Sequence, residues 1–225
     1  MWVVPLAAAA VALAFGLLLA RRFLARRRPY HALWALALAM FAAASFAVFL
    51  GVLDHWSTGE YRVFWLFGAV LNVPFLAAGE LTLLIPRRQV VNALFLVLLF
   101  GSAFALSRVL SAHIAPGSLR GDLPSGSEVF ARDHFALTLA RGYSFPAYFV
   151  LVAGAVWSAR GMRGRPEVRD RFVGTVGVVA GATIVAAGSA FAATGNATGF
   201  SVTLAVGVSV MFWGFLRASR TPARS

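Results

Sequence analysis

The sequence predicts an all-α fold, a polytopic transmembrane bundle of seven helices with the N-terminus outside and the C-terminus cytoplasmic. Hydrophobic residues make up 60% of the 225 residues and charged residues only 12%, whereas soluble domains average roughly 25% charged residues. The apolar residues form seven stretches, each close to the roughly 20 residues that a helix needs to cross a hydrocarbon core of about 30 Å. The basic residues collect on alternate connections between these stretches.

We expect a single domain, residues 1–225, with one long connection on the outer side at 112–134. The seven spans are expected at 3–20, 31–52, 62–85, 90–111, 135–159, 172–193 and 200–216.

The orientation follows from the arginines, because short connections rich in basic residues stay cytoplasmic. Most of the 20 basic residues lie on the first, third and fifth connections and in the tail: Arg21, Arg22, Arg26, Arg27, Arg28, Arg87, Arg88, Arg160, Arg163, Arg165, Arg169, Arg171, Arg217, Arg220 and Arg224. The other side carries five of the eight acidic residues, Asp54, Glu60, Asp122, Glu128 and Asp133, with Arg62, Arg108, Arg120 and Arg132 near the span ends.

Aromatic side chains at the span ends favour the same boundaries, since Trp and Tyr are enriched at membrane interfaces. Trp2, Trp56, Tyr61 and Trp65 would form the outer belt, and Tyr30, Trp34, Trp157 and Trp213 the inner one.

The net charge of +12 fits this topology better than nucleic-acid binding, because the arginines flank spans and do not gather on a polar domain. We expect the cytoplasmic arginines to contact the anionic headgroups of the bilayer. The absence of lysine, together with heavy use of Ala, Gly and Val, suggests a bacterial chain and hence the cytoplasmic (inner) membrane.

Several kinds of seven-helix protein are excluded by missing residues. Without lysine there is no Schiff base for retinal, and without cysteine there is no disulfide, thiolate or Cys-ligated metal. His31, His55, His113 and His134 all lie at span ends, unlike the axial ligands of a haem or the clustered ligands of an intramembrane zinc enzyme. We therefore expect no catalytic residue, cofactor or metal site, and no enzyme.

Small residues at helical spacing predict close helix packing, which in lipid replaces the hydrophobic effect. Ala35, Ala39, Ala43 and Ala47 form such a ladder in the second span, and Gly177 and Gly181 form a GxxxG pair in the sixth. A homodimer face is the alternative, but with seven spans to pack in one chain we favour contacts within the bundle.

Two ionisable side chains fall within spans, where a charge costs roughly 3 kcal/mol at the helix centre. Glu80 lies near the cytoplasmic end of the third span, with Arg87 two turns further along the same helix. It is either a proton, cation or ligand site or one half of a structural ion pair. Arg141 lies in the outer half of the fifth span and would bind an anion or pair with Asp133, Asp54 or Glu60; if that span begins near Gly142, Arg141 is only interfacial.

Polar residues and prolines occur at matched depth in the third and fifth spans: Asn72 and Pro74, then Tyr143, Ser144 and Pro146. A proline within a helix frees a carbonyl four residues earlier and bends the axis, and polar side chains nearby can satisfy that carbonyl or line a cavity. We expect Asn72, Glu80, Arg141, Tyr143 and Ser144 to surround an internal ligand pocket, with Pro74 and Pro146 as kinks. Kinks that only shape packing are the alternative.

The long outer connection contains APGSLRGDLPSGSE, whose Pro, Gly, Ser and mixed charges predict an irregular, solvated cap with no globular domain. It would close over a pocket that opens outward, or remain a plain flexible loop.

The segments RRFLARRRP, ALWALALAMFAAASFAVF and YRVFWLFGAVLNVPFLAAGELTLLIPRR resemble small seven-span bacterial membrane proteins of unassigned function. The topology and the third-span pattern are also loosely similar to the seven-span sensor module of some histidine kinases. Only nine residues follow Leu216, so we expect no attached output domain, and neither resemblance implies functional residues.

These observations favour a sensing, ligand-binding or membrane-assembly module that takes an apolar or lipid-like ligand or docks to a separate protein partner. The alternative is a small-solute transporter with a pathway between the third and fifth helices. A transporter requires a polar path from one face to the other with Glu80 facing it, whereas a binding module requires only a closed pocket.

Overall fold

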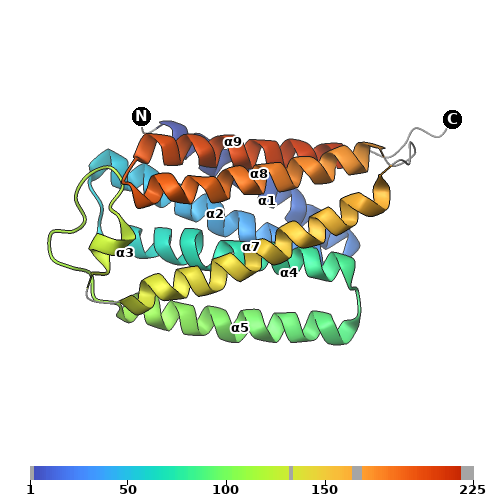
Figure 1. Cartoon of the computed structure of the whole chain (residues 1–225), viewed down its shortest axis with the longest axis horizontal. Helices are drawn as coiled ribbons and strands as arrows, with labels where there is room; N and C mark the ends of the chain where they lie inside the picture. Colours follow the sequence, from blue (N-terminus) through green and yellow to red (C-terminus); the bar gives the residue numbers. More distant parts are fainter. Residues whose placement is uncertain (1–2, 132–133, 164–168, 219–225) are drawn as a thin grey trace.

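The computed structural model describes residues 3–131, 134–163 and 169–218. These residues form helices and loops, without any β-strand. Seven helices within them are long and apolar enough to cross a membrane, as the sequence predicts. Figure 1 shows these helices side by side along one long axis. The helices are α1 Val3–Arg26, α2 Pro29–Asp54, α3 Thr58–Val63, η1 Phe64–Leu71, α4 Asn72–Leu84, α5 Arg88–Ser111, α6 Gly126–Val129, α7 His134–Met162, α8 Arg169–Ala193 and α9 Ala197–Ala218.

The third span is composite, because α3, η1 and α4 follow one another without a break from Thr58 to Leu84. The short helix α6 belongs to the outer connection. Several helices extend beyond the expected spans, and α1 reaches Arg26. A helix need not end where the membrane ends; this one ends where Arg27 adopts the left-handed conformation (φ 51°) and Pro29 begins α2.

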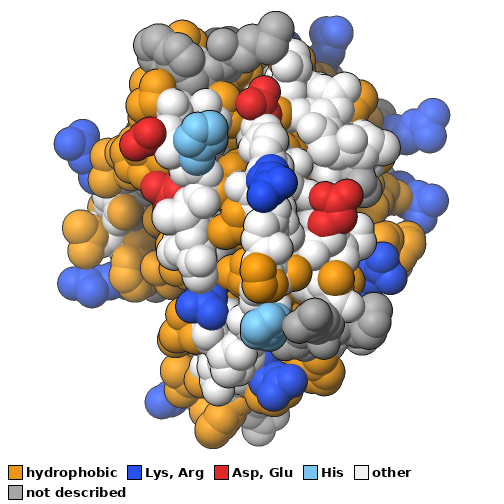
Figure 2. Space-filling view, turned by 90° about the vertical axis from the view of Figure 1, so that its left-hand side faces the viewer, with side chains coloured by type: hydrophobic (Ala, Val, Ile, Leu, Met, Phe, Trp, Pro, Cys, Tyr) orange, Lys and Arg blue, Asp and Glu red, His pale blue; other side chains and the backbone are white. Residues whose placement is uncertain are grey.

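Helices α1, α4 and α7 end at one end of the bundle, and α5 ends and α7 begins at the other (Figure 1). The first of these ends is the one that the arginines predict to be cytoplasmic. The opposite face carries acidic, histidine and basic side chains among uncharged groups (Figure 2). Some residues used to predict the topology lie outside the described ranges: Trp2, Arg132, Asp133, Arg165, Arg220 and Arg224.

Glycines allow α8 and α9 to pack with their backbones in contact. A Cβ added at Gly181 would lie 2.5 Å from the Gly207 carbonyl oxygen and 2.7 Å from the Met211 nitrogen. At Gly177 it would lie 3.0 Å from the Gly214 Cα. The structure thus places both residues of the GxxxG pair against α9 of the same chain.

The alanine ladder of α2 meets more than one neighbour. A Cβ at Gly16 of α1 would lie 3.4 Å from the Ala35 carbonyl oxygen and 3.7 Å from the Ala39 nitrogen, whereas Ala47 is buried in the bundle core and Ala43 is half-buried. Ala39 itself is exposed beside the α1 contact. With 3.6 residues per turn, residues spaced by four rotate gradually around a helix, so the ladder cannot face a single partner along its whole length.

We predict that Gly181→Ala destabilises the protein by about 1–3 kcal/mol, because its methyl group must displace backbone atoms of α9. Thermal unfolding in detergent measures this. Gly142→Ala is the matched control, since a Cβ there meets nothing within 4 Å. Equal stability of the two variants would contradict the close α8–α9 packing.

Candidate ligand cavity

The third span changes helical register just before Pro74. Residues Phe64–Leu71 form a π-helix, and the α-helical register resumes at Asn72. Proline has no N–H, so the carbonyl that its position would serve lies four residues back in an α-helix and five residues back in a π-helix. Val70 lies four residues before Pro74 and Ala69 lies five residues before it, and Pro74 can donate a backbone hydrogen bond to neither carbonyl.

The Ser144 hydroxyl of α7 donates a 2.6 Å hydrogen bond to one of these two carbonyls, that of Ala69. The neighbouring Tyr143 hydroxyl donates to the Gly101 carbonyl of α5 at 3.2 Å. Consecutive residues of α7 thus bond to η1 and α5. The expectation that polar side chains at the depth of Pro74 satisfy a freed carbonyl corresponds to the Ser144 contact. Pro146 lies within α7 and is exposed.

Asn72 ties the third span to α2. Its Nδ2 donates to the Ala37 carbonyl at 3.0 Å, and the side chain is 5% exposed. One turn further along α4, the Leu76 carbonyl accepts a hydrogen bond from Trp34 Nε1 at 3.1 Å. The third span is therefore held on one side by α2 and on the other by α7.

The outer connection is fastened to the bundle. Its Val129 and Phe130 are fully buried. Trp56 Nε1 donates to the Asp122 carbonyl at 3.0 Å, and the Tyr61 hydroxyl donates to the Pro124 carbonyl at 3.3 Å. The expectation of a solvated cap is therefore wrong for this part of the loop.

The prediction of an outer aromatic belt is also wrong for two of its four residues. Trp56 and Tyr61 are 6% and 0% exposed, and they lie beneath the outer connection and not at a lipid-facing surface. Enrichment at span ends identifies a depth in the membrane and not the direction in which a side chain points. Trp157 and Trp213 at the other end are exposed, as an interfacial position requires.

A cavity of about 720 Å³ lies between α2, the third span, α7, α8 and α9. This volume is within the range of about 300–1,000 Å³ that small-molecule sites occupy. Most of its lining side chains are apolar, and residues 124–127 of the outer connection and α6 cover its outer end.

The cavity opens between α7 and α8, which lie together near the α7–α8 connection and diverge toward the opposite end (Figure 1). Arg141 and Phe145 from α7 and Thr183 and Ala187 from α8 line the cavity and are exposed. The Tyr148 hydroxyl donates to Thr183 Oγ1 at 3.2 Å and joins the two helices near the inner limit of this opening.

Three of the five residues expected around a pocket line this cavity: Asn72, Arg141 and Ser144. Arg141 is the sole charged residue among the lining side chains, and no hydrogen bond or ion pair joins it to the part of the chain that the structure describes. It lies seven residues after the start of α7, about 10 Å along the helix. Helix α7 begins at His134, eight residues before Gly142, and it is longer than the roughly 20 residues that cross a hydrocarbon core, so the start of the span near either residue stays a prediction.

Tyr143 and Glu80 do not line the cavity. Glu80 is 6% exposed and lies against α7, where a Cβ on Gly154 would be 2.8 Å from the Glu80 Cγ. The expected continuation of its helix to Arg87 is wrong. Helix α4 ends at Leu84, because Pro86 disfavours the helical conformation of Ile85, and Arg87 is an exposed residue that precedes α5.

Ser45 of α2 also lines the cavity, and sequence reasoning missed it. It is 1% exposed and its hydroxyl has no hydrogen-bond partner. In an alanine-rich helix a serine looks like another small packing residue, so no signal in the sequence distinguished it. Tyr148 and Thr183 were missed for a similar reason, because their pairing depends on how α7 crosses α8.

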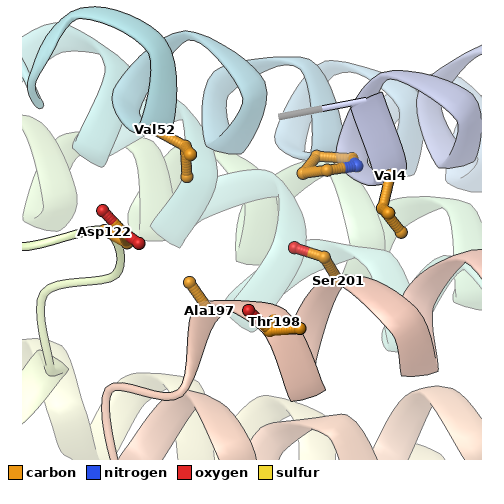
Figure 3. A pocket seen from close by; sticks show the side chains of 7 residues that line it. Val4, Val52, Asp122, Ala197, Thr198 and Ser201 are labelled. Carbon is orange, nitrogen blue, oxygen red and sulfur yellow. The ribbon is translucent and has the colours of Figure 1, made fainter. Parts of the chain in front are cut away.

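A second, much smaller pocket lies near the outer end of the bundle. Figure 3 shows Asp122 of the outer connection across from Ala197, Thr198 and Ser201 at the start of α9. Its volume of about 30 Å³ suits a single water molecule and no larger ligand.

None of the protein-family models, curated proteins and solved structures compared with this chain matches it. The larger cavity is therefore the feature from which its function is inferred.

We predict that Ser144→Ala lowers stability by about 0.6 kcal/mol and by no more than about 1.7 kcal/mol, the range found for hydrogen bonds between transmembrane helices. The expected cause is the loss of the donor to the Ala69 carbonyl. Ser189→Ala is the control, because the exposed Ser189 hydroxyl bonds only to the Ala186 carbonyl of its own helix. Thermal unfolding in detergent compares them, and an equal effect would show that the α7–η1 bond contributes nothing.

Proposed function

We propose that this protein is a non-catalytic module of a cellular membrane that binds an apolar or lipid-like small molecule in the cavity between α2, the third span, α7, α8 and α9. The observation that carries the proposal is the combination of the cavity's volume, about 720 Å³, with its largely apolar lining. If this space were empty, every side chain around it would lose packing contacts, so a bound molecule would be stabilising.

The position of the opening supports a ligand that arrives through the membrane. Phe145 and Ala187 lie at the opening, on faces of α7 and α8 that are exposed at the level of the spans. An apolar molecule dissolved in the bilayer reaches this opening without crossing water. The outer connection, by contrast, closes the end of the cavity through the hydrogen bonds of Trp56 and Tyr61.

Transport is the less favoured function. A pathway through the bundle requires polar groups from one face to the other, with Glu80 among them. The lining of the cavity extends inward to Leu76, Leu151 and Met211, all apolar, and Glu80 lies one turn beyond Leu76 against Gly154. This arrangement favours a chamber with one opening over a continuous pathway.

The ligand would act by changing how α7 and α8 pack, and a separate protein partner would bind to the changed arrangement of these helices. The basic residues at the end of α1 and α7 would hold this end of the bundle against anionic lipid headgroups. The arginine-only basic composition favours the inner membrane of a bacterium.

We predict that Ala186→Trp weakens retention of the bound molecule at least about tenfold, because a large side chain would occupy the cavity that Ala186 lines. The measurement is native mass spectrometry of the whole chain extracted from its own membrane. Ala190→Trp is the matched control, since Ala190 lies one turn further along α8, is exposed and does not line the cavity.

A stoichiometric small molecule on the unmodified chain and on Ala190→Trp, with loss from Ala186→Trp, would support the function. Equal retention by both tryptophan variants would exclude the cavity as the binding site.

A further inference from the structure

We infer that the ligand is an anionic lipid that enters sideways between α7 and α8, with its charged headgroup on Arg141 and one acyl chain in the cavity. This inference rests on the proposed function and names the chemistry of its ligand. It is based on three features of the cavity: the charge of Arg141, the Ser45 hydroxyl without a hydrogen-bond partner, and the elongated shape.

The charge comes from Arg141 alone. Among the residues that the structure describes, no acidic residue and no other basic residue lines the cavity, and none pairs with the guanidinium. An arginine about 10 Å along a membrane-spanning helix is costly unless an anion or water compensates it. The planar guanidinium also matches phosphate oxygens in a two-pronged hydrogen-bonding geometry. The mouth of the cavity thus complements an anionic headgroup.

The free hydroxyl belongs to Ser45. Other hydroxyls that line the cavity donate to protein oxygens: Ser144 to the Ala69 carbonyl, Thr183 to the Val179 carbonyl and Ser189 to the Ala186 carbonyl. A serine within a helix usually bonds back to a carbonyl of the preceding turn. Ser45 does not, although it is 1% exposed. A buried donor without a partner is expected to meet an acceptor on a ligand.

Ser45 and Arg141 are similarly far along their helices from the outer ends. Ser45 is nine residues from the outer end of α2, about 14 Å, and Arg141 is seven residues from the start of α7, about 10 Å. An ester carbonyl sits just below the phosphate of a phospholipid, so one molecule can place its phosphate at Arg141 and an ester carbonyl near Ser45.

The cavity is long enough to accommodate a lipid acyl chain. Along α7 the lining runs from Arg141 to Leu151, ten residues or about 15 Å, and on α9 it runs from Phe200 to Met211. The walls along this length are largely apolar, and the polar side chains of Asn72, Ser144 and Thr183 are already bonded to backbone carbonyls. Because the gap between α7 and α8 is open beside Phe145 and Ala187, the second acyl chain of a phospholipid can stay in the membrane.

The test uses native mass spectrometry of the delipidated whole chain with two probes that share their acyl chains, dioleoyl phosphatidylglycerol and dioleoyl phosphatidylcholine. We expect the unmodified chain to prefer the anionic lipid. Arg141→Gln should weaken the first phosphatidylglycerol binding event roughly tenfold and weaken phosphatidylcholine binding less, because the choline ammonium offsets the negative charge of the phosphate that both headgroups carry.

Arg160→Gln is the matched control for headgroup contacts elsewhere, because Arg160 is an exposed residue of the same helix that does not line the cavity. It should keep the full preference. Arg141→Lys, which retains the charge, should keep a preference for phosphatidylglycerol and provides a second readout if Arg141→Gln fails to fold.

Full preference for phosphatidylglycerol in Arg141→Gln, or an equal loss in Arg141→Gln and Arg160→Gln, would overturn the inference. Equal binding of both lipids to the unmodified chain, with loss of both in Ala186→Trp, would also overturn it while the proposed function stands. If Ala186→Trp lowers the binding of neither lipid, the cavity does not bind lipid and both proposals fail.

Discussion

A backbone carbonyl inside a membrane must be hydrogen-bonded, and in this protein that requirement centres on Pro74. Pro74 has no N–H and follows the π-helix η1, and the Ala69 carbonyl five residues before it accepts a hydrogen bond from Ser144 of α7. The preceding residue, Tyr143, bonds to the Gly101 carbonyl of α5. These two hydrogen bonds hold the outer half of α7 against the third span and α5.

The cavity arises because the outer half of α7 packs on one group of helices, η1 and α5, and not on the other, α8 and α9. The outer half of α7 is tied to η1 and α5, whereas α8 packs on α9 through Gly177 and Gly181. Helix α9 in turn packs on α1, where Phe15 stacks on Phe212 with ring centroids 4.9 Å apart. As α7 diverges from α8, the side chains between them are too small to fill the space. The opening of the cavity lies on the outer surface of the helix bundle, between α7 and α8.

The sequence determined the number and order of the spans, because apolar length alone identifies a membrane helix. It also identified Asn72, Arg141 and Ser144, which line the cavity. It could not reveal the π-helix, since a register change depends on partners such as Ser144 that are distant in the sequence. Glu80 was expected at the pocket only because it is ionisable, and its direction toward Gly154 depends on how α4 crosses α7. Burial of Trp56 and Tyr61 required the path of the outer connection, which no local pattern encodes.

The central claim is that α7 stands apart from α8 and that a ligand occupies the gap. A crystal structure of the protein grown in a lipidic mesophase tests it most directly. We predict elongated density between the outer halves of α7 and α8, with Ser144 bonded to the Ala69 carbonyl and density for a headgroup at Arg141. Direct packing of α7 on α8, with Ser144 away from Ala69 and no space between Phe145 and Ala187, would contradict the account.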